Sequence, residues 1–189
     1  MRKLFAVFLF LTAGVFLQAQ SLTWDISFIK ANSQGANPEC VPVSQIIRME
    51  TGQTFVFAVM PEVNAYCYVI AHMSSRRIAV MHDRQLSSGE EKVFGIYRLV
   101  EPAGTEIFYV IMSIERLTDL EALIRQFNDN PNSKQASDSL YREVISLQSA
   151  VSAAGEPAVS FIPMGGDVSG FSTSFSGRKL YVRAIEIRH

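Results

Sequence analysis

Short runs of Val, Ile, Phe and Tyr, separated by turn segments, dominate residues 51–113. Five of these runs have the length and composition of β-strands: Thr54–Met60, Tyr66–Ala71, Ile78–Met81, Lys92–Leu99 and Glu106–Met112. Several short strands at this spacing predict a sandwich or a barrel. The first and last of the five are almost continuously apolar, so we expect them to be central strands covered on both faces.

Both ends of this region continue the strand pattern. In Leu22–Phe28 apolar and polar residues alternate strictly, which predicts a strand with one buried and one wet face. Phe171–Ser176 alternates aromatic or Thr residues with serines in the same way. Gly177-Arg178-Lys179 then leads into the apolar run Leu180–Ile187, and the two runs together predict a terminal hairpin.

Two helices are expected between Ser113 and this terminal pair. Thr118-Asp119-Leu120-Glu121 has the spacing of a capping box and predicts a helix over 118–127. A second apolar stripe with helical spacing predicts a helix over Asp138–Val151, after a polar loop at 128–137. Docking on the sheet is the favoured interpretation of both stripes, and partner binding is the alternative. The expected fold is mainly β, an antiparallel β-sandwich of about seven to nine strands with two flanking α-helices.

The first residues indicate export. Arg2 and Lys3 precede an apolar run, Leu4–Leu17, and Leu17-Gln18-Ala19 has the small residues of a cleavage site. This order predicts a signal peptide over residues 1–19. The alternative is a membrane anchor, but the run is shorter than the roughly 20 residues that span a bilayer. We therefore expect an exported protein, periplasmic or secreted. Residues 20–189 are expected to form a single β-sandwich domain with a helical insert near 118–151.

Charge excludes two classes of partner. The whole chain has 17 basic and 18 acidic residues, and removal of Arg2 and Lys3 with the signal peptide lowers the net charge from −1 to −3. The mature part has no basic block or stripe, so we expect it to bind neither nucleic acid nor an anionic membrane surface. No later segment is long and apolar enough to predict a membrane span.

Cys40 and Cys67 are the two cysteines of the chain, and both belong to the part expected to be exported. Because disulfides form in oxidising compartments, we expect a Cys40–Cys67 bond that ties the long loop 31–42 to a core strand. The alternative is two separate thiols, with Cys67 a small buried residue.

The candidate chemistry is sparse. His72, His82 and His189 show none of the spacings of a zinc site, and we expect neither a metal nor another cofactor. His82 and Asp83 could orient a base for Ser87 or Ser88, in imitation of a hydrolase triad. The favoured alternative is a solvated loop. Arg76, Arg77 and Arg84 are candidates for a small anion site.

One family resemblance rests on the order of several weak motifs. These are Gly52, Phe55–Phe57, the strand 66–70, Leu86 with Gly89, and the segment from Pro102 through Glu106 to Ser113. In this order residues 50–127 resemble the bacterial domain-of-unknown-function family 4384. The resemblance implies a β-rich and often exported module without an established activity.

Taken together, these features predict a non-catalytic binding or assembly module of the cell envelope. A hydrolase built on His82 and Asp83 is the alternative, and a purely structural envelope component cannot be separated from a binding module by sequence. As the partner-binding edge we expect the strand containing Phe171, Ser172, Ser174 and Ser176, whose wet face is uncharged. The partner would be another envelope protein, bound through this sheet edge or through loops. The alternative is that Leu22–Phe28 covers this edge.

Overall fold

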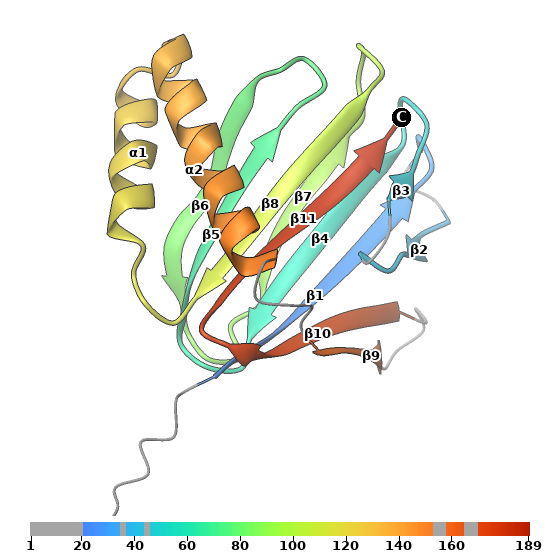
Figure 1. The fold of residues 1–189 in the computed structure, drawn as a ribbon. Helices are drawn as coiled ribbons and strands as arrows, with labels where there is room; N and C mark the ends of the chain where they lie inside the picture. Colours follow the sequence, from blue (N-terminus) through green and yellow to red (C-terminus); the bar gives the residue numbers. More distant parts are fainter. Residues whose placement is uncertain (1–20, 35–36, 44–45, 153–157, 165–169) are drawn as a thin grey trace, which may run out of the picture.

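Two β-sheets face each other across a shared hydrophobic core, and two helices lie against the outer face of one sheet (Figure 1). The structure, a computed structural model, describes residues 21–189 except 35–36, 44–45, 153–157 and 165–169. For residues 152, 158–164 and 170–171 it describes the backbone alone. The expected signal peptide lies outside the described residues.

The sheets differ in their strands and share no strand. Sheet A has the order β7 (Lys92–Arg98), β4 (Thr54–Pro61), β1 (Leu22–Ala31), β10 (Gly170–Arg178), β9 (Ala158–Met164), with the short β2 (Glu39–Cys40) also paired to β1. Sheet B has the order β3 (Ile47–Arg48), β11 (Leu180–Arg188), β8 (Thr105–Ser113), β5 (Ala65–His72), β6 (Ile78–Leu86). The pairs are antiparallel except β3 with β11, which is parallel. The mainly β fold with two helices is therefore confirmed.

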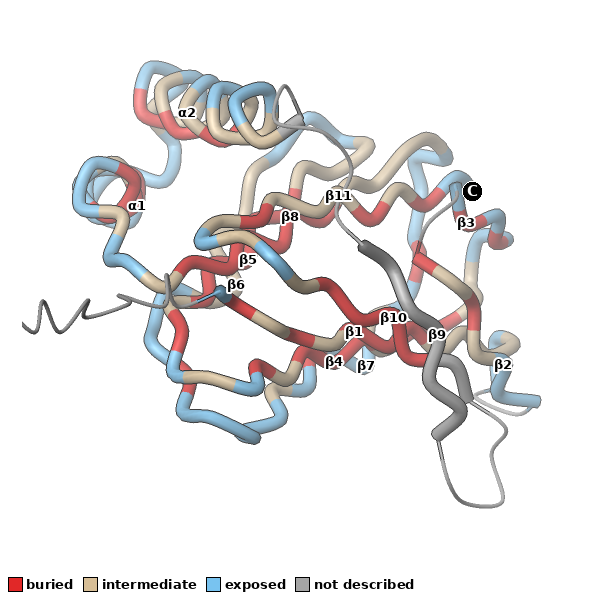
Figure 2. The backbone as a smooth tube through the Cα atoms, turned by 60° about the horizontal axis from the view of Figure 1, so that its bottom comes forward, coloured by how far each residue is buried: buried red, intermediate tan, exposed pale blue. Residues whose placement is uncertain are grey.

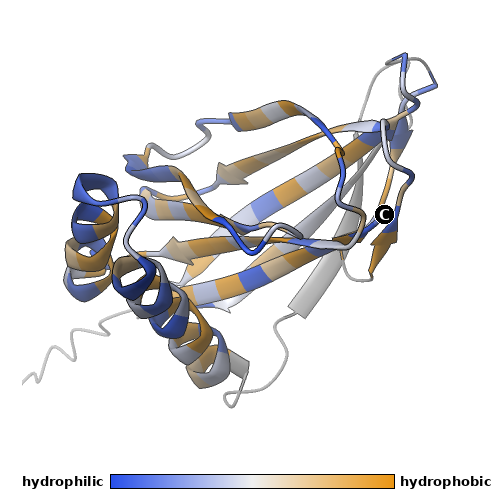
Figure 3. Cartoon of the chain, turned by 90° about the horizontal axis from the view of Figure 1, so that it is seen from above, coloured by the Kyte–Doolittle hydropathy of each residue, from blue (hydrophilic) through white to orange (hydrophobic). Residues whose placement is uncertain are grey.

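The core between the sheets follows from the alternation of each strand. Trp24 and Phe28 of β1 point inward from sheet A, and Val110 and Met112 of β8 point inward from sheet B. Trp24 stacks on Phe175 with ring centroids 4.8 Å apart. Figure 2 shows the buried residues gathered along the facing strands, and Figure 3 shows apolar and polar residues alternating along them.

Helices α1 (Thr118–Asp129) and α2 (Lys134–Ser152) cover only sheet B. Their apolar stripes, with Leu120, Ile124 and Leu140, pack on the outward side chains of β5 and β8, among them Tyr68 and Tyr109. The expected docking of the helices on the sheet is confirmed. Strand β8 is consequently covered on both faces, whereas β4 has no helix on its outer side. Among the described residues, no helix has the length and apolar character needed to cross a bilayer.

The helix starts differ from the predicted ones. Thr118 is the first residue of α1 and not its cap, and the N-cap residue Leu117 makes no side-chain capping bond. The Glu121 carboxylate instead accepts hydrogen bonds from Tyr68 and Arg116, so the predicted capping box is wrong. Helix α2 begins four residues earlier than predicted, because the Ser133 hydroxyl accepts the N–H of Ala136 in its first turn.

The predicted terminal hairpin is also wrong. Strands β10 and β11 follow each other directly, but β10 belongs to sheet A and β11 to sheet B. Arg178 pairs with Leu22 of β1, whereas Leu180 pairs with Ser113 of β8. The chain therefore crosses between the sheets at Lys179, and its short turn is indistinguishable by composition from a hairpin turn.

Candidate functional site

The strand expected to bind a partner is an interior strand of sheet A. Ser174 of β10 pairs with Asp25 of β1 on one side and with Ser160 of β9 on the other. Ser172 likewise has neighbours on both sides, Ser27 and Ile162, whereas Phe171 and Ser176 pair with Pro163 and Ala158 of β9. The prediction of a free edge there is wrong. Strand β9, which the sequence pattern does not predict, pairs with the other side of β10. Proline usually argues against a strand, but β9 is the edge strand of the sheet, where Pro163 is tolerated.

The two cysteines lie on different sheets and face different ways. Cys40 pairs with Ile29 of β1, and Phe28 beside Ile29 points into the core, so Cys40 lies on the outer face of sheet A. Cys67 of β5 is fully buried between the sheets, where burial raises the pKa of its thiol to about 12. Both cysteines are free, and the predicted disulfide is wrong in this structure.

His82 and Asp83 are adjacent in sequence but face opposite sides of sheet B. A β-bulge at Met81 lets Met81 and His82 both point toward the core, where the His82 ring meets Phe94 edge-on. Burial lowers the pKa of His82, and the nearby Lys92 cation lowers it further. Asp83 pairs with Tyr68, whose side chain packs under the helices, so its carboxylate faces that outer side. The pair cannot form the oriented base of a triad in this arrangement.

The other sequence candidates also lie apart from one another. Ser87 and Ser88 are held in the turn between β6 and β7, where the Ser88 hydroxyl donates to the Glu62 carbonyl. The ring of His72 packs on Tyr141 of α2, with centroids 4.6 Å apart. Arg76 and Arg77 precede β6, whereas Arg84 lies near its far end, so the three do not converge. Among the described residues, no cluster of His, Cys, Asp and Glu is arranged to hold a metal ion.

The strongest candidate site is an apolar cavity at the open side of the sandwich, which we call the seam cavity. There one edge strand of sheet A, β7, lies across from one edge strand of sheet B, β6, and the rings of Phe94 and His82 meet between them. The cavity has a volume of about 280 Å³. Its lining residues come from β4, β6, β7, β8 and the adjoining turns: Phe55, Met73, Ala79, Met81, Tyr97, Arg98, Leu99, Val100, Glu106 and Phe108. A concave apolar space with few polar groups is the usual form of a binding site.

Two strand irregularities border the seam cavity. One is the bulge at Met81 in β6. The other lies in β7, where the two residues Gly95 and Ile96 stand opposite the single residue Val56 of β4. Gly95 has φ +124°, and a Cβ atom there would lie 3.0 Å from the Phe55 carbonyl oxygen, so glycine is required. Bulges often occur beside functional sites, where they redirect side chains. They also interrupt the row of edge amides that an added strand would need.

A carboxylate enters the seam cavity from β8. Glu106 follows the same alternation as Phe108 and therefore lies on the core side of sheet B, with only 13% of its side chain exposed. Its Oε1 accepts the Ser74 hydroxyl at 2.8 Å. The fully buried imidazole of His189 lies beside it, with Nε2 3.5 Å from Oε1 and Nδ1 3.3 Å from the Thr51 hydroxyl.

Sequence reasoning missed Glu106, although a signal for it exists. It occupies the core-facing register of a strand whose next inward residues are Phe108, Val110 and Met112. A charged residue in an apolar stripe is the kind of exception that marks a site or a buried pair. His189 continues the inward register of Ile185 and Ile187 in the same way.

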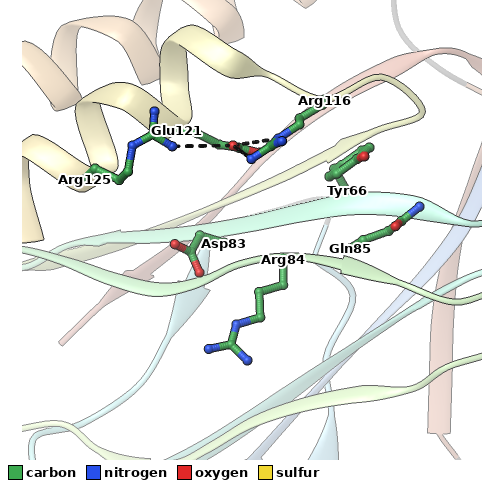
Figure 4. A pocket seen from close by; sticks show the side chains of 7 residues that line it. All are labelled: Tyr66, Asp83, Arg84, Gln85, Arg116, Glu121 and Arg125. Carbon is green, nitrogen blue, oxygen red and sulfur yellow. Dashed lines mark hydrogen bonds and ion pairs between the residues drawn. The ribbon is translucent and has the colours of Figure 1, made fainter.

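A second hollow, of about 400 Å³, lies between α1 and the outer face of β6, and Figure 4 shows its side chains. Arg116 and Arg125 flank Glu121, which pairs with both at 2.7 and 3.9 Å. Arg84 points away from them. Because Glu121 already engages the two convergent cations, we interpret this hollow as part of the attachment of α1 and not as an anion site.

Comparison of the chain with family models, with curated proteins and with solved structures gave no match. The resemblance to family 4384 is therefore still a prediction, and the candidate site rests on its geometry.

Proposed function

We propose that the protein is an exported, non-catalytic binding module of the cell envelope and that the seam cavity is its binding site. The observation that carries the proposal is the apolar cavity itself, which is open between the two free sheet edges. It offers a ligand Phe55, Tyr97, Phe108 and two methionine side chains. Aromatic and methionine side chains favour apolar ligands and adapt to their shape.

The edge strand β7 and the residues after it carry several exposed apolar side chains. Along and after β7, Val93, Ile96 and Val100 are 52%, 81% and 63% exposed. Val100 also lines the seam cavity, so its exposed apolar surface continues from the cavity wall. Because both edge strands are bulged, insertion of an apolar group between the sheets is favoured over addition of a partner strand.

The geometry favours binding over the alternative hydrolase. His82 and Asp83 lie on opposite faces of sheet B, and the two serines proposed to join them are held in a turn.

A photo-reactive phenylalanine analogue tests this function in living cells. Placed at Val100 on the cavity rim, it should form a defined adduct in the envelope fraction. The same analogue at Ile46, next to the opposite edge strand β3, should form none. The exported protein should begin at Gln20, which N-terminal sequencing checks.

A cavity-filling variant makes the test specific. Ala79→Phe places a ring in the seam cavity and should abolish the Val100 adduct. Ala122→Phe adds the same ring on the exposed side of α1 and should leave the adduct unchanged. Equal adducts from Val100 and Ile46, or an adduct that persists in a folded Ala79→Phe protein, would contradict the proposal.

A further inference from the structure

The seam cavity is apolar along its walls and carries one acceptor that its own residues leave unused. Glu106 Oε1 has the Ser74 hydroxyl at 2.8 Å and the His189 imidazole at 3.5 Å. Within the described chain, no donor lies within hydrogen-bond distance of the second oxygen, Oε2. Oε2 is not among the fully buried atoms that lack a partner, so it is accessible from the cavity and a hydrogen-bond donor on a ligand can reach it. A charged acceptor makes a stronger hydrogen bond than a neutral one.

Among the described residues, no Lys or Arg forms an ion pair with Glu106. The Ser74 hydroxyl has one proton and two acceptors, since the Pro102 carbonyl lies 2.9 Å away. Nε2 of His189 makes no hydrogen bond. Of the cavity-lining residues the remaining charged one is Arg98, which pairs with Thr54 and so lies on the face of sheet A opposite to Phe55. In the part of the chain that the structure describes, no ion pair joins Arg98 to Glu106.

The size of the cavity limits the apolar part of a ligand. About 280 Å³ corresponds to roughly nine water molecules, each with about 30 Å³ in the liquid. A methylene group takes similar space, so a chain on the order of eight carbons with a small head group fills it. The rings of Phe55, Tyr97 and Phe108 stand around this space with centroids 5.4 to 6.1 Å apart, and aromatic faces attract a cation as well as an apolar chain.

We propose that the seam cavity binds a small alkylammonium compound. Its apolar chain lies among Met73, Met81 and the aromatic rings, and its ammonium donates a hydrogen bond to Glu106 Oε2. This inference rests on the proposed function, which requires only that the cavity bind an apolar group. It adds the chemical class of that group, and Glu106 is the residue that determines it.

Three probes of one length test the class: octylammonium, octanol and octanoate. The two ionic probes are titrated below their micelle concentrations, and octanol below its solubility limit, into wild-type protein at pH 8, where histidine side chains are ordinarily neutral. The readout is the ¹³C-methyl NMR signal of methionine. Met73 and Met81 line the cavity and should shift, whereas Met112 lies six residues along β8 from Glu106 and should not. Because a charge-assisted hydrogen bond is about twice as strong as a neutral one, octylammonium should bind about tenfold tighter than octanol. Octanoate should bind at least about tenfold weaker than octanol, since its charge repels Glu106.

Glu106→Gln keeps the shape of the side chain and removes its charge. It should reduce the preference for octylammonium over octanol to less than about threefold, with octanol affinity nearly unchanged. Glu101→Gln, in the exposed turn before β8, makes the same change in net charge and should keep the preference.

The outcomes separate this inference from the proposed function. If Met73 and Met81 shift with equal affinity for all three probes, or most strongly with octanoate, the cavity binds apolar groups and the alkylammonium proposal is refuted. If no probe shifts them, the cavity is not a binding site and both proposals fail. The comparison of probes on wild-type protein decides the matter even if Glu106→Gln does not fold.

Discussion

Replacement of Glu121 by alanine should loosen the attachment of α1 to sheet B. The Glu121 side chain is 11% exposed and accepts the hydroxyl of Tyr68, which is buried in β5, at 2.9 Å. The same hydroxyl accepts the backbone N–H of Leu117 at 3.1 Å, directly before the helix. Burial raises the pKa of Tyr68, so its hydroxyl stays protonated and acts as the donor to Glu121.

The magnitude follows from which of these bonds are shielded from water. A hydrogen bond to a charged group contributes roughly 1.5–3 kcal/mol, and Tyr68 loses such a bond in Glu121→Ala. Arg116 is 58% exposed, and solvent screens its ion pair, so we assign it no part of the loss. We therefore expect Glu121→Ala to lower the free energy of unfolding by about 2–3 kcal/mol, or Tm by roughly 5–10 °C. Glu121→Gln retains an oxygen acceptor for Tyr68 and should cost about 1 kcal/mol.

Urea unfolding, followed by circular dichroism and by fluorescence of the single tryptophan, Trp24, measures these losses. Gln126→Ala, on the exposed side of α1, is the control and should stay within about 0.5 kcal/mol of wild type.

The stability difference should also depend on pH. The Arg116 guanidinium holds the pKa of Glu121 below its usual value. A lowered carboxyl pKa stabilises the fold above the unfolded pKa, near 4.3, and this contribution is lost as pH falls through the folded value. The difference between wild type and Glu121→Gln should therefore be present at pH 7 and shrink below about pH 4. A Glu121→Ala protein as stable as the Gln126→Ala control would refute the reasoning.

Two further predictions concern the corrected elements. Cys40 should react with iodoacetamide in the native protein, whereas Cys67, buried and with a pKa near 12, should react only after unfolding; mass spectrometry of labelled peptides checks this, and equal labelling of both would contradict it. Ser174→Pro should destabilise the protein by at least about 3 kcal/mol, because proline removes a ladder donor from a strand with neighbours on both sides; a cooperatively folded variant with an unchanged urea midpoint would show that β10 tolerates an edge residue.

Alternation along the chain was sufficient to predict most strands and both helices. In Leu22–Phe28 every second side chain enters the core, so burial leaves a direct trace in the residue pattern. Which strands become hydrogen-bonded neighbours leaves no such trace in the residue pattern. The turn at Lys179 has the same composition whether the next strand joins the same sheet or the other one, and for that reason the hairpin was predicted wrongly.

The candidate site was less accessible to sequence reasoning. The Thr118–Glu121 spacing matches a capping box, but the Glu121 carboxylate accepts a hydrogen bond from Tyr68, 53 residues away, and makes no capping bond. The seam cavity is formed where β6 and β7 face each other from different sheets. Its existence depends on how the two sheets pack, and local spacing carries no information on this. The one feature of the sequence pattern that pointed to the seam cavity was Glu106, a charged residue at a core-facing position of its strand.

The pairing of β1 with β10 also sets the order in which the chain can fold. Strands β5, β6 and β8 pair among neighbours in sequence, whereas Trp24 of β1 meets Phe175 of β10 roughly 150 residues later. A chain made from its N-terminus therefore has β4 on one side of β1 and β2 at the Ile29–Lys30 end of the other side, while the stretch Leu22–Ser27 that pairs with β10 stays open until the last strands arrive. During that interval the open side of β1 is exposed to pairing with other chains, and arrival of β10 closes it.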